Sequence, residues 1–138
     1  MIVLDTNVLS ELMRTNPSVS VVRWVSAQPA TSLYTTAVSE AEILFGLSLV
    51  APGKRRHALE AAARAMFELD FSGRILAFER NAARSFAEIA AHRRRAGRPI
   101  SQYDAQIAAI ARATGGALAT RNVDDFDDCG IDVINPFS

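Results

Sequence analysis

The chain has few of the residues that would place it in several common classes of protein. It has one cysteine, Cys129, so no disulfide can form within it and a zinc site built on thiolates is unsupported. No uncharged apolar stretch approaches the roughly 20 residues that a membrane-spanning helix needs. The start lacks the basic segment of a secretory signal peptide, and Asp5 interrupts its apolar run. We therefore expect a cytoplasmic protein with no membrane segment.

An excess of charge of either sign is also missing. Fifteen basic residues balance fifteen acidic ones, so the chain as a whole is not drawn to nucleic acid or to anionic membranes. Its 138 residues, 49% of them hydrophobic, are enough for one well-packed core. No repeat, low-complexity segment or linker divides the chain. We expect one domain spanning residues 1–138.

Strand-like and helical segments alternate along the chain. Residues 1–4 form a short apolar run of the kind found in buried parallel strands. Further strands are expected at 32–36, 74–78, 117–120 and 132–134, and the main helices at 37–50, 58–67, 81–96 and 101–114. Residues 37–50 are apolar around nearly the whole helix, which predicts burial on several sides. The alternation predicts an α/β fold with a mostly parallel, about five-stranded sheet flanked by helices.

Two acids lie where strands and helices meet. Asp5 stands between the first strand and a helix that Thr6 or Asn7 can cap, a position at which open α/β sheets bind ligands. Asp104 lies in the first turn of the helix that starts at Ser101. The alternatives are local: Asp5 can simply cap its helix, and an acid at position 104 is favoured by the helix dipole.

A third acid, Glu42, lies on the apolar helix 37–50. Ser39, Glu42 and Gly46 fall at i, i+3 and i+7, which makes a narrow polar and small seam on one face. The seam indicates that Glu42 faces something inside the protein that favours a carboxylate. The alternative is a capping box, in which Glu42 bonds back to the amide of Ser39. Glu40 points elsewhere and is a weaker candidate for the rim of a site.

A fourth group follows the strand at 117–120 and consists of Asn122, Asp124 and Asp125. Like charges that meet at one sheet edge raise one another's pKa unless a cation joins them. Oxygen ligands without histidine or cysteine suit Mg²⁺ or Mn²⁺. Such an ion can orient a phosphodiester and activate water. The pattern therefore indicates hydrolytic phosphoryl-transfer chemistry.

Four motifs, in this order, resemble those of the PIN-domain ribonucleases, and most of all the VapC and FitB toxins of bacterial toxin–antitoxin pairs. They are Leu4-Asp5-Thr6-Asn7-Val8-Leu9, Val38-Ser39-Glu40-Ala41-Glu42-Ile43-Leu44-Phe45-Gly46, Gly97-Arg98-Pro99-Ile100 leading to Asp104-Ala105-Gln106-Ile107-Ala108-Ala109, and Ala119-Thr120-Arg121-Asn122-Val123-Asp124-Asp125-Phe126. Each motif alone is weak, but together they cover nearly the whole chain, down to Val133-Ile134-Asn135-Pro136-Phe137.

The resemblance implies a three-layer α/β sandwich and an endoribonuclease dependent on Mg²⁺ or Mn²⁺. It also implies a cognate antitoxin that blocks the site, and a homodimer or toxin–antitoxin hetero-oligomer. By position, the family's acids fall on Asp5, Glu42 and Asp104. The fourth place is open, because relatives carry either an aspartate where this chain has Asn122 or an acid where it has Asp125. The supporting residues expected around them are Thr6, Asn7, Ser39, Thr120 and Asp124.

Basic residues near the end of helix 81–96 are the candidates for gripping RNA phosphates. Arg93, Arg94 and Arg98 could do so in a salt-sensitive way. The alternative, which we favour, is that cations at a helix C-terminus cover a solvated face.

Two other classes compete with the nuclease. Phosphoacceptor proteins and haloacid-dehalogenase-like phosphatases also use an aspartate after the first strand. They usually need a lysine near it, and the single lysine, Lys54, lies in a turn between helices. The phosphatase pattern also requires an acid two residues after the nucleophile, where this chain has Asn7. The second competitor is an inactive PIN module that binds RNA or a protein without cutting, which Asn122 leaves open.

Overall fold

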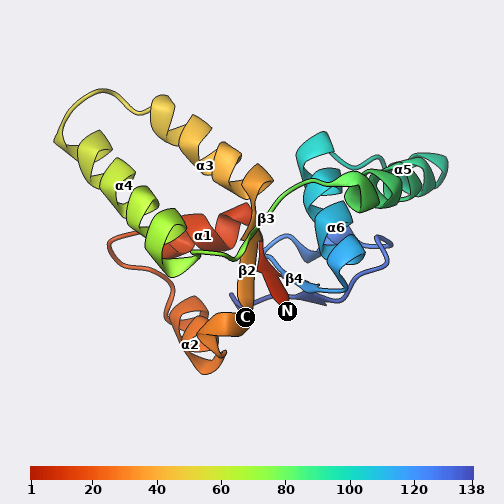
Figure 1. The fold of residues 1–138 in the computed structure, drawn as a ribbon, viewed down its shortest axis with the longest axis horizontal. Helices are drawn as coiled ribbons and strands as arrows, with labels where there is room; N and C mark the ends of the chain where they lie inside the picture. Colours follow the sequence, from red (N-terminus) through yellow and green to blue (C-terminus); the bar gives the residue numbers. More distant parts are fainter.

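The computed structural model describes residues 1–138 and contains one five-stranded sheet between two groups of helices (Figure 1). The strands are β1 (Ile2–Leu4), β2 (Leu33–Thr36), β3 (Ile75–Leu76), β4 (Ala117–Ala119) and β5 (Val133–Ile134). Their order is β3-β2-β1-β4-β5, and all four neighbouring pairs are parallel. The predicted α/β fold with a five-stranded parallel sheet is confirmed.

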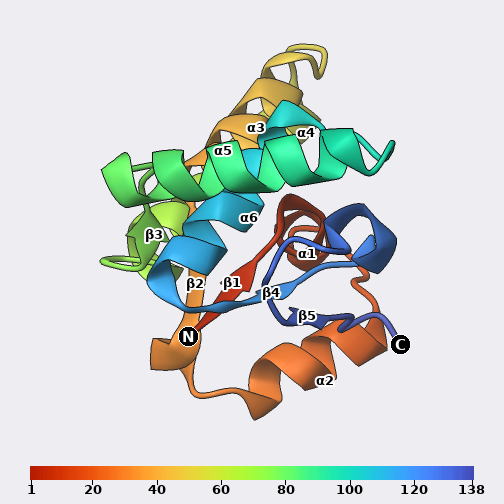
Figure 2. The same cartoon turned by 90° about the vertical axis from the view of Figure 1, so that its right-hand side faces the viewer.

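Helices cover both faces of the sheet. They are α1 (Thr6–Leu12), α2 (Val19–Ala27), α3 (Ala37–Ser48), α4 (Lys54–Ala65), α5 (Arg80–Arg95) and α6 (Gln102–Thr114), with short turns of helix at Ala30–Ser32, Met66–Asp70 and Val123–Phe126. The first four lie on one side of the sheet, and α5 and α6 lie together on the other (Figure 2). None of the helices is both long and apolar enough to span a bilayer.

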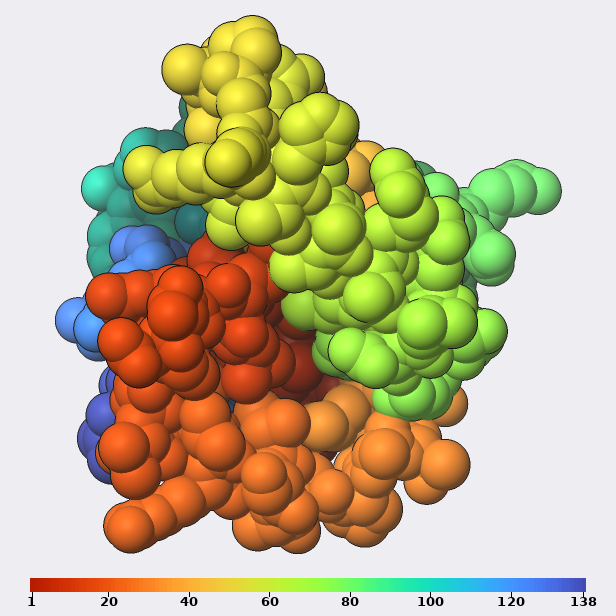
Figure 3. Space-filling view, turned by 90° about the vertical axis from the view of Figure 1, so that its left-hand side faces the viewer, coloured from red at the N-terminus to blue at the C-terminus, as the bar shows by residue number.

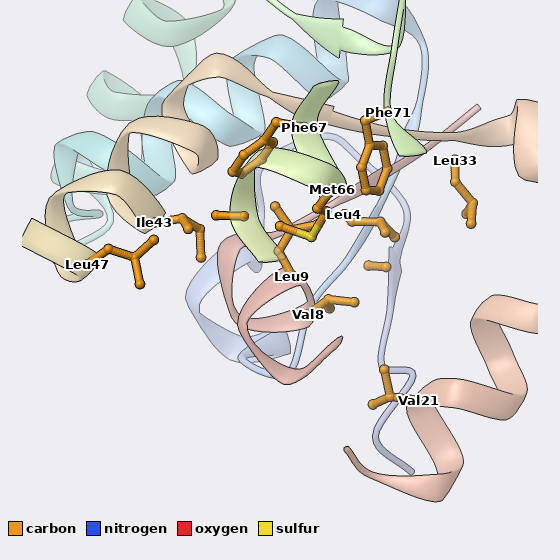
Figure 4. Close-up of a cluster of buried hydrophobic side chains, with 12 residues drawn as sticks. Leu4, Val8, Leu9, Val21, Leu33, Ile43, Leu47, Met66, Phe67 and Phe71 are labelled. Atoms are coloured by element: carbon orange, nitrogen blue, oxygen red, sulfur yellow. The ribbon is translucent and has the colours of Figure 1, made fainter. Parts of the chain in front are cut away.

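The sheet divides the core in two because successive side chains of a strand point to opposite faces. Leu4 of β1 belongs to a cluster with residues of α1 to α4 (Figure 4), whereas Val3 belongs to a cluster with α5 and α6. In β4, Ala119 joins the first cluster and Leu118 the second. Full burial of one such leucine contributes about 1.5–3 kcal/mol. The two cores therefore fix β1 and β4 side by side at the centre of the sheet.

The helix caps differ from the expected ones at two places. Asp5 itself caps α1 by accepting from the amide of Thr6, so the expectation that Thr6 or Asn7 caps it is wrong. The cap of α3 is Thr36, whose hydroxyl accepts from the amide of Ser39 at 3.0 Å. Ser39 therefore lies inside the helix, and the capping box is excluded as an explanation of Glu42.

The expected burial of α3 on several sides is wrong. Ser39, Ile43 and Leu47 are buried, but Leu44, Phe45 and Leu49 are exposed, Phe45 by 66%. The helix and α4 form a hairpin that projects away from the sheet (Figure 1), so only one stripe of α3 meets the rest of the chain. An apolar composition alone could not distinguish an all-round core helix from one with an apolar outer face.

Candidate active site

The order of the strands brings polar groups together at one edge of the sheet. From β1 the chain continues to β2 on one side, and it later returns to β4 on the other side. In parallel α/β sheets, ligands bind at such a reversal, beyond the carboxyl ends of the strands. Asp5 follows β1 and Thr120 follows β4, and the amide of Asp5 donates to the carbonyl of Ala119 at 2.9 Å.

Asp5 is the most buried acid at this edge, with 4% of its surface exposed. The hydroxyl of Thr120 donates to its Oδ2 at 2.8 Å, and the side-chain amide of Asn7 donates to the same oxygen at 3.1 Å. The amide of Thr6 holds Oδ1 at 2.8 Å. Burial nevertheless raises the pKa of Asp5 from 3.8 to about 6, and the charges of Asp104 and Glu42 add to the rise. No arginine or lysine pairs with it.

Glu42 is tied to this group through Thr6. The Thr6 hydroxyl donates to Oε1 of Glu42 at 2.8 Å and lies 2.9 Å from the hydroxyl of Ser39. A hydroxyl has one hydrogen, so Ser39 donates to Thr6 when Thr6 donates to Glu42. Burial raises the pKa of Glu42, although the bond from Thr6 opposes the rise. The seam of Ser39 and Glu42 on α3 therefore faces α1 at the carboxyl edge.

Asp104 completes the group from the other side of the sheet. Ser101 caps α6 by accepting from the amide of Asp104 at 3.2 Å, as expected, and this places Asp104 in the first turn. Burial is the main cause that raises the pKa of Asp104, and the nearby charge of Asp125 contributes. We call Asp5, Glu42 and Asp104 the carboxylate group.

The carboxylate group lines a single cleft of about 500 Å³ with no hydrophobic side chain in its walls. We call it the acidic cleft; its other lining residues are Thr6, Asn7, Ser10, Glu11, Arg14, Arg121 and Asn122. No three acidic, histidine or cysteine side chains are arranged so that they could hold a metal ion as they stand. This does not conflict with Mg²⁺ chemistry, because that ion keeps several waters and uses only one or two carboxylates directly. The donor set, made of carboxylate and amide oxygens, fits Mg²⁺ or Mn²⁺.

The candidates after β4 are placed differently from one another. Asn122 lines the acidic cleft, and its backbone amide donates to the hydroxyl of Thr120 at 3.1 Å. Asp124 and Asp125 are exposed on the short turn Val123–Phe126 and do not line the cleft. Asp125 is close enough for its charge to act on Asp104. Of the open choices for the fourth position, Asn122 is therefore the one inside the cleft.

Arg93 matches neither reading given to the arginines of α5. It is only 5% exposed, so it neither covers a solvated face nor reaches RNA. Its guanidinium donates to the backbone carbonyls of Arg98, Asp125 and Asp127, at 2.7, 2.9 and 2.9 Å. Arg98 is exposed and pairs with Asp127 at 3.1 Å, whereas Arg94 is exposed with no such pair. Arg93 thus holds the loop that carries Asp125.

Four lining residues of the acidic cleft escaped the sequence analysis, namely Ser10, Glu11, Arg14 and Arg121. Their only signal in the sequence was proximity to the first and fourth motifs. Glu11 lies two turns along α1 from Asp5, and Arg121 stands between Thr120 and Asn122, both of which had been singled out. The sequence favoured α5 as the source of RNA-binding arginines because three consecutive arginines lie there.

A second, larger cavity of about 690 Å³ adjoins the acidic cleft. It lies between α1, α3 and α4, and Thr6, Ser10, Arg14 and Glu42 line both hollows. Figure 3 shows this face of the molecule, with the red α1 segment beneath the yellow end of the α3–α4 hairpin. Ile43, Leu47 and Leu59 make part of its wall apolar. The polar site therefore opens sideways into a partly apolar groove.

Comparisons with known proteins agree with this arrangement. A family model described as PIN domain matches residues 2–131. A VapC ribonuclease of Sinorhizobium fredii, Y4jK, is 40% identical over 99% of this chain and 98% of the relative. Toxin FitB of Neisseria gonorrhoeae is 34% identical over 99% of each chain. The structure of FitAB bound to a DNA fragment covers 100% of this chain and 96% of that chain, with 33% identity and a TM-score of 0.93. The similarity extends over the whole chain.

Proposed function

This chain belongs to the PIN-domain family, and we propose that it is an endoribonuclease dependent on Mg²⁺ or Mn²⁺, the toxin of a type II toxin–antitoxin pair acting in the cytoplasm. The observation that carries the proposal is the carboxylate group. Three acids from separate elements line one cleft, all with raised pKa values and none paired with a cation of the protein.

Asp5, Glu42 and Asp104 would hold the ion, one or two of them directly and the others through its bound waters, with Asn122 as a neutral oxygen donor. When bound, a divalent cation neutralises the carboxylates, polarises a phosphodiester and lowers the pKa of a bound water. Thr120 and Asn7 keep Oδ2 of Asp5 turned toward β4, and Thr6 keeps Glu42 turned toward α1. These bonds hold the two acids in place before a substrate arrives, so little reorganisation is left for the reaction.

Asp124 and Asp125 lie outside the acidic cleft and have indirect roles in the proposal. Asp125 adds negative charge that acts on Asp104 and would favour a second cation there. The carbonyl of Asp124 accepts from the amide of Asp127 and so supports the turn that Asp124 shares with Asp125. No side chain of the protein needs to be attacked, because water is the nucleophile in metal-assisted hydrolysis of phosphodiesters.

Cleavage of a fluorescent single-stranded RNA tests the function. We expect cutting with Mg²⁺ or Mn²⁺, none with a chelator, and loss of cutting in Asp5→Asn. Glu60→Gln is the matched control, since Glu60 pairs with Arg56 on α4, outside the acidic cleft. Binding of the RNA without any cutting by the wild-type protein would favour the inactive module. A covalent phosphate on Asp5 would favour the phosphatase class.

The partner proposed for this chain is a cognate antitoxin. The relatives include the FitAB complex, and the groove beside Glu42 is where a bound segment would cover the acidic cleft from the side. The exposed apolar side chains of α3 offer a surface for a homodimer or a hetero-oligomer. Light scattering of the chain alone and after co-expression with the product of a neighbouring small gene tests both. A complex that leaves RNA cleavage unchanged would contradict the inhibitory role.

A further inference from the structure

The acidic cleft has two basic residues in its wall, Arg14 and Arg121, and neither pairs with the carboxylate group. Both lie toward α1. The same cleft is therefore lined by carboxylates and by guanidinium groups that do not pair with them. An acidic cleft repels a polyanion such as RNA, and the zero net charge of the chain gives no compensating attraction. The two arginines are thus the protein's own cations at the place where a phosphate chain would enter.

Arg121 is held in position from two sides. Its guanidinium carbon lies 4.4 Å from the centre of the Phe137 ring, a cation–π contact that holds the guanidinium over that ring. Its backbone amide donates at 3.2 Å to the side-chain oxygen of Asn7, the residue whose amide group donates to Asp5. Arg121 is therefore fixed to the network of the carboxylate group without neutralising it, and its exposed guanidinium edge stays free for a ligand.

Arg14 is held by a buried acid. Glu11 is only 6% exposed, and its Oε2 accepts from the amide of Ser18 at 2.8 Å. The other carboxylate contact of Glu11 is with the guanidinium of Arg14, at 3.3 Å, and Arg14 itself is largely exposed. The bond from Ser18 is the main cause that lowers the pKa of Glu11, with Arg14 contributing. Glu11 therefore stays ionised and anchors Arg14 at the cleft.

We propose that Arg14 and Arg121 bind phosphate oxygens of the RNA beside the bond to be cut, and that Phe137 and Glu11 position them. This inference rests on the proposed function and adds the path of the substrate, which enters over α1. Of the candidates on the α5 side, only Arg94 is both exposed and unpaired, and it does not line the acidic cleft. Arg93 is buried and Arg98 pairs with Asp127. Guanidinium groups suit the task, since they present two donors at once to a phosphate.

Steady-state kinetics on the fluorescent RNA at several salt concentrations test the proposal. Arg121→Ala and Arg14→Ala should each raise KM about tenfold, leave kcat within about twofold, and lower the slope of log affinity against log salt by about 0.7 per lost phosphate contact. Arg112→Ala is the control, because Arg112 pairs with Glu88 near the far end of α6 from Asp104. Arg94→Ala tests the rival path over α5.

Phe137→Leu separates positioning from charge. It keeps both arginines but removes the ring beneath Arg121, so KM should rise about threefold while the salt slope stays that of the wild-type protein. A fall in the slope on this substitution would contradict the positioning role. Arg121→Lys should recover the slope but not the full affinity, because lysine keeps the charge and loses the two-donor geometry.

A binding measurement keeps the test independent of cleavage. Fluorescence anisotropy of the same RNA with Asp5→Asn protein should show weaker binding when Arg14 or Arg121 is also replaced by alanine. If the wild-type protein cuts nothing and this loss persists, the proposed function fails, whereas the assignment of Arg14 and Arg121 to RNA binding stands. If cleavage depends on Asp5 but KM and the salt slope ignore both arginines, the inference is overturned alone. Loss of antitoxin binding with unchanged RNA binding would also overturn it.

Discussion

Two acidic regions of this protein differ in whether arginines pair with their acids. In the loop Asp124–Asp128, the exposed Asp127 and Asp128 face Arg98, and the buried guanidinium of Arg93 holds the backbone of the same loop. The carboxylate group at the sheet edge has no such partner, and its three pKa values are raised. The density of acids along the chain is highest in the loop, yet the acids that are both unpaired and at least partly buried lie at the sheet edge.

The difference shows which property marks a candidate site. Acids close in sequence can be compensated by one nearby arginine, as Arg98, in the segment after α5, does for Asp127 and Asp128. Acids that come from α1, α3 and α6 meet only through the tertiary structure, and burial without a cation makes their charged forms costly. Unpaired and partly buried carboxylates therefore mark the candidate site, whereas exposed carboxylates paired with an arginine do not.

We expect acids of the two regions to contribute unequally to RNA cleavage. Asp104→Asn should lower the rate of RNA cleavage by about 100- to 1000-fold, the usual loss when one electrostatic group of an active site is removed. Asp128→Asn should change the rate by less than about twofold. Both are measured as single-turnover rates on one RNA with Mn²⁺. Equal losses would mean that the loop belongs to the site.

The role of Arg93 as the structural cation of the loop is tested by Arg93→Met. Three backbone carbonyls lose a buried donor, so we expect the free energy of unfolding to fall by about 2–4 kcal/mol. Urea unfolding measures it, with the exposed neighbour Arg94→Met as control at less than about 0.5 kcal/mol. A loss below that value in Arg93→Met would remove the buried arginine from the stability of the loop.

The uncompensated charge of Asp5 should appear as a pH dependence. Its pKa is raised from 3.8 to about 6, so the folded protein binds this proton more tightly than the unfolded chain does. Without a divalent ion, the contribution of Asp5 to stability is therefore fully present below about pH 4 and is lost as the pH rises through about 6. Asp5→Asn should be more stable than the wild-type protein at pH 7.5, by up to about 3 kcal/mol, with the gap closing near pH 4.

Urea unfolding in a chelator, repeated from pH 4 to 8, measures this gap, and Asp128→Asn is the control that should gain nothing. Mn²⁺ should stabilise the wild-type protein more than Asp5→Asn, because the ion replaces the missing positive charge. A variant that is no more stable than the wild-type protein at pH 7.5 would contradict the cost assigned to Asp5.

The smallest effect is expected at the surface pair of the loop. Arg98→Ala removes the exposed contact with Asp127 and should lower the free energy of unfolding by less than about 1 kcal/mol. The difference should shrink further in high salt, since exposed charges are screened. Thermal unfolding at low and high salt checks both points. A loss as large as that of Arg93→Met would mean that exposure does not separate the two arginines.

Much of the fold could be predicted from local sequence. Short apolar runs bounded by turns gave five strands whose centres agree with β1 to β5, and Ser101 was expected at the start of α6 and is its cap. Helix 81–96 was displaced by one residue from α5. The expectation that Lys54 lies in a turn before a helix at 58–67 is wrong, because Lys54 is the first residue of α4. These features depend on periodicity, capping and turn residues, all of which are set by residues close together in the sequence.

The errors arose where a distant element decides the outcome. Phe45 is exposed because α3 projects beyond the sheet, and no property of residues 37–50 encodes that direction. Arg93 is buried because the loop after β4 folds over it, about 30 residues later in the chain. Glu42 was assigned correctly to the interior seam, but its bond to Thr6 joins residues that only the sheet brings together.

By itself, the sequence determined the alternation of strands and helices, the absence of a disulfide, and the candidate acids near strand ends, because each follows from the chemistry of adjacent residues. Only the tertiary structure decided that Asp5, Glu42 and Asp104 share one cleft, that Asn122 rather than Asp125 lines it, and that Arg14 and Arg121 are its cations. The physical reason is that charge interactions depend on distance and burial, which the chain order of β1 and β4 does not specify until the sheet has formed.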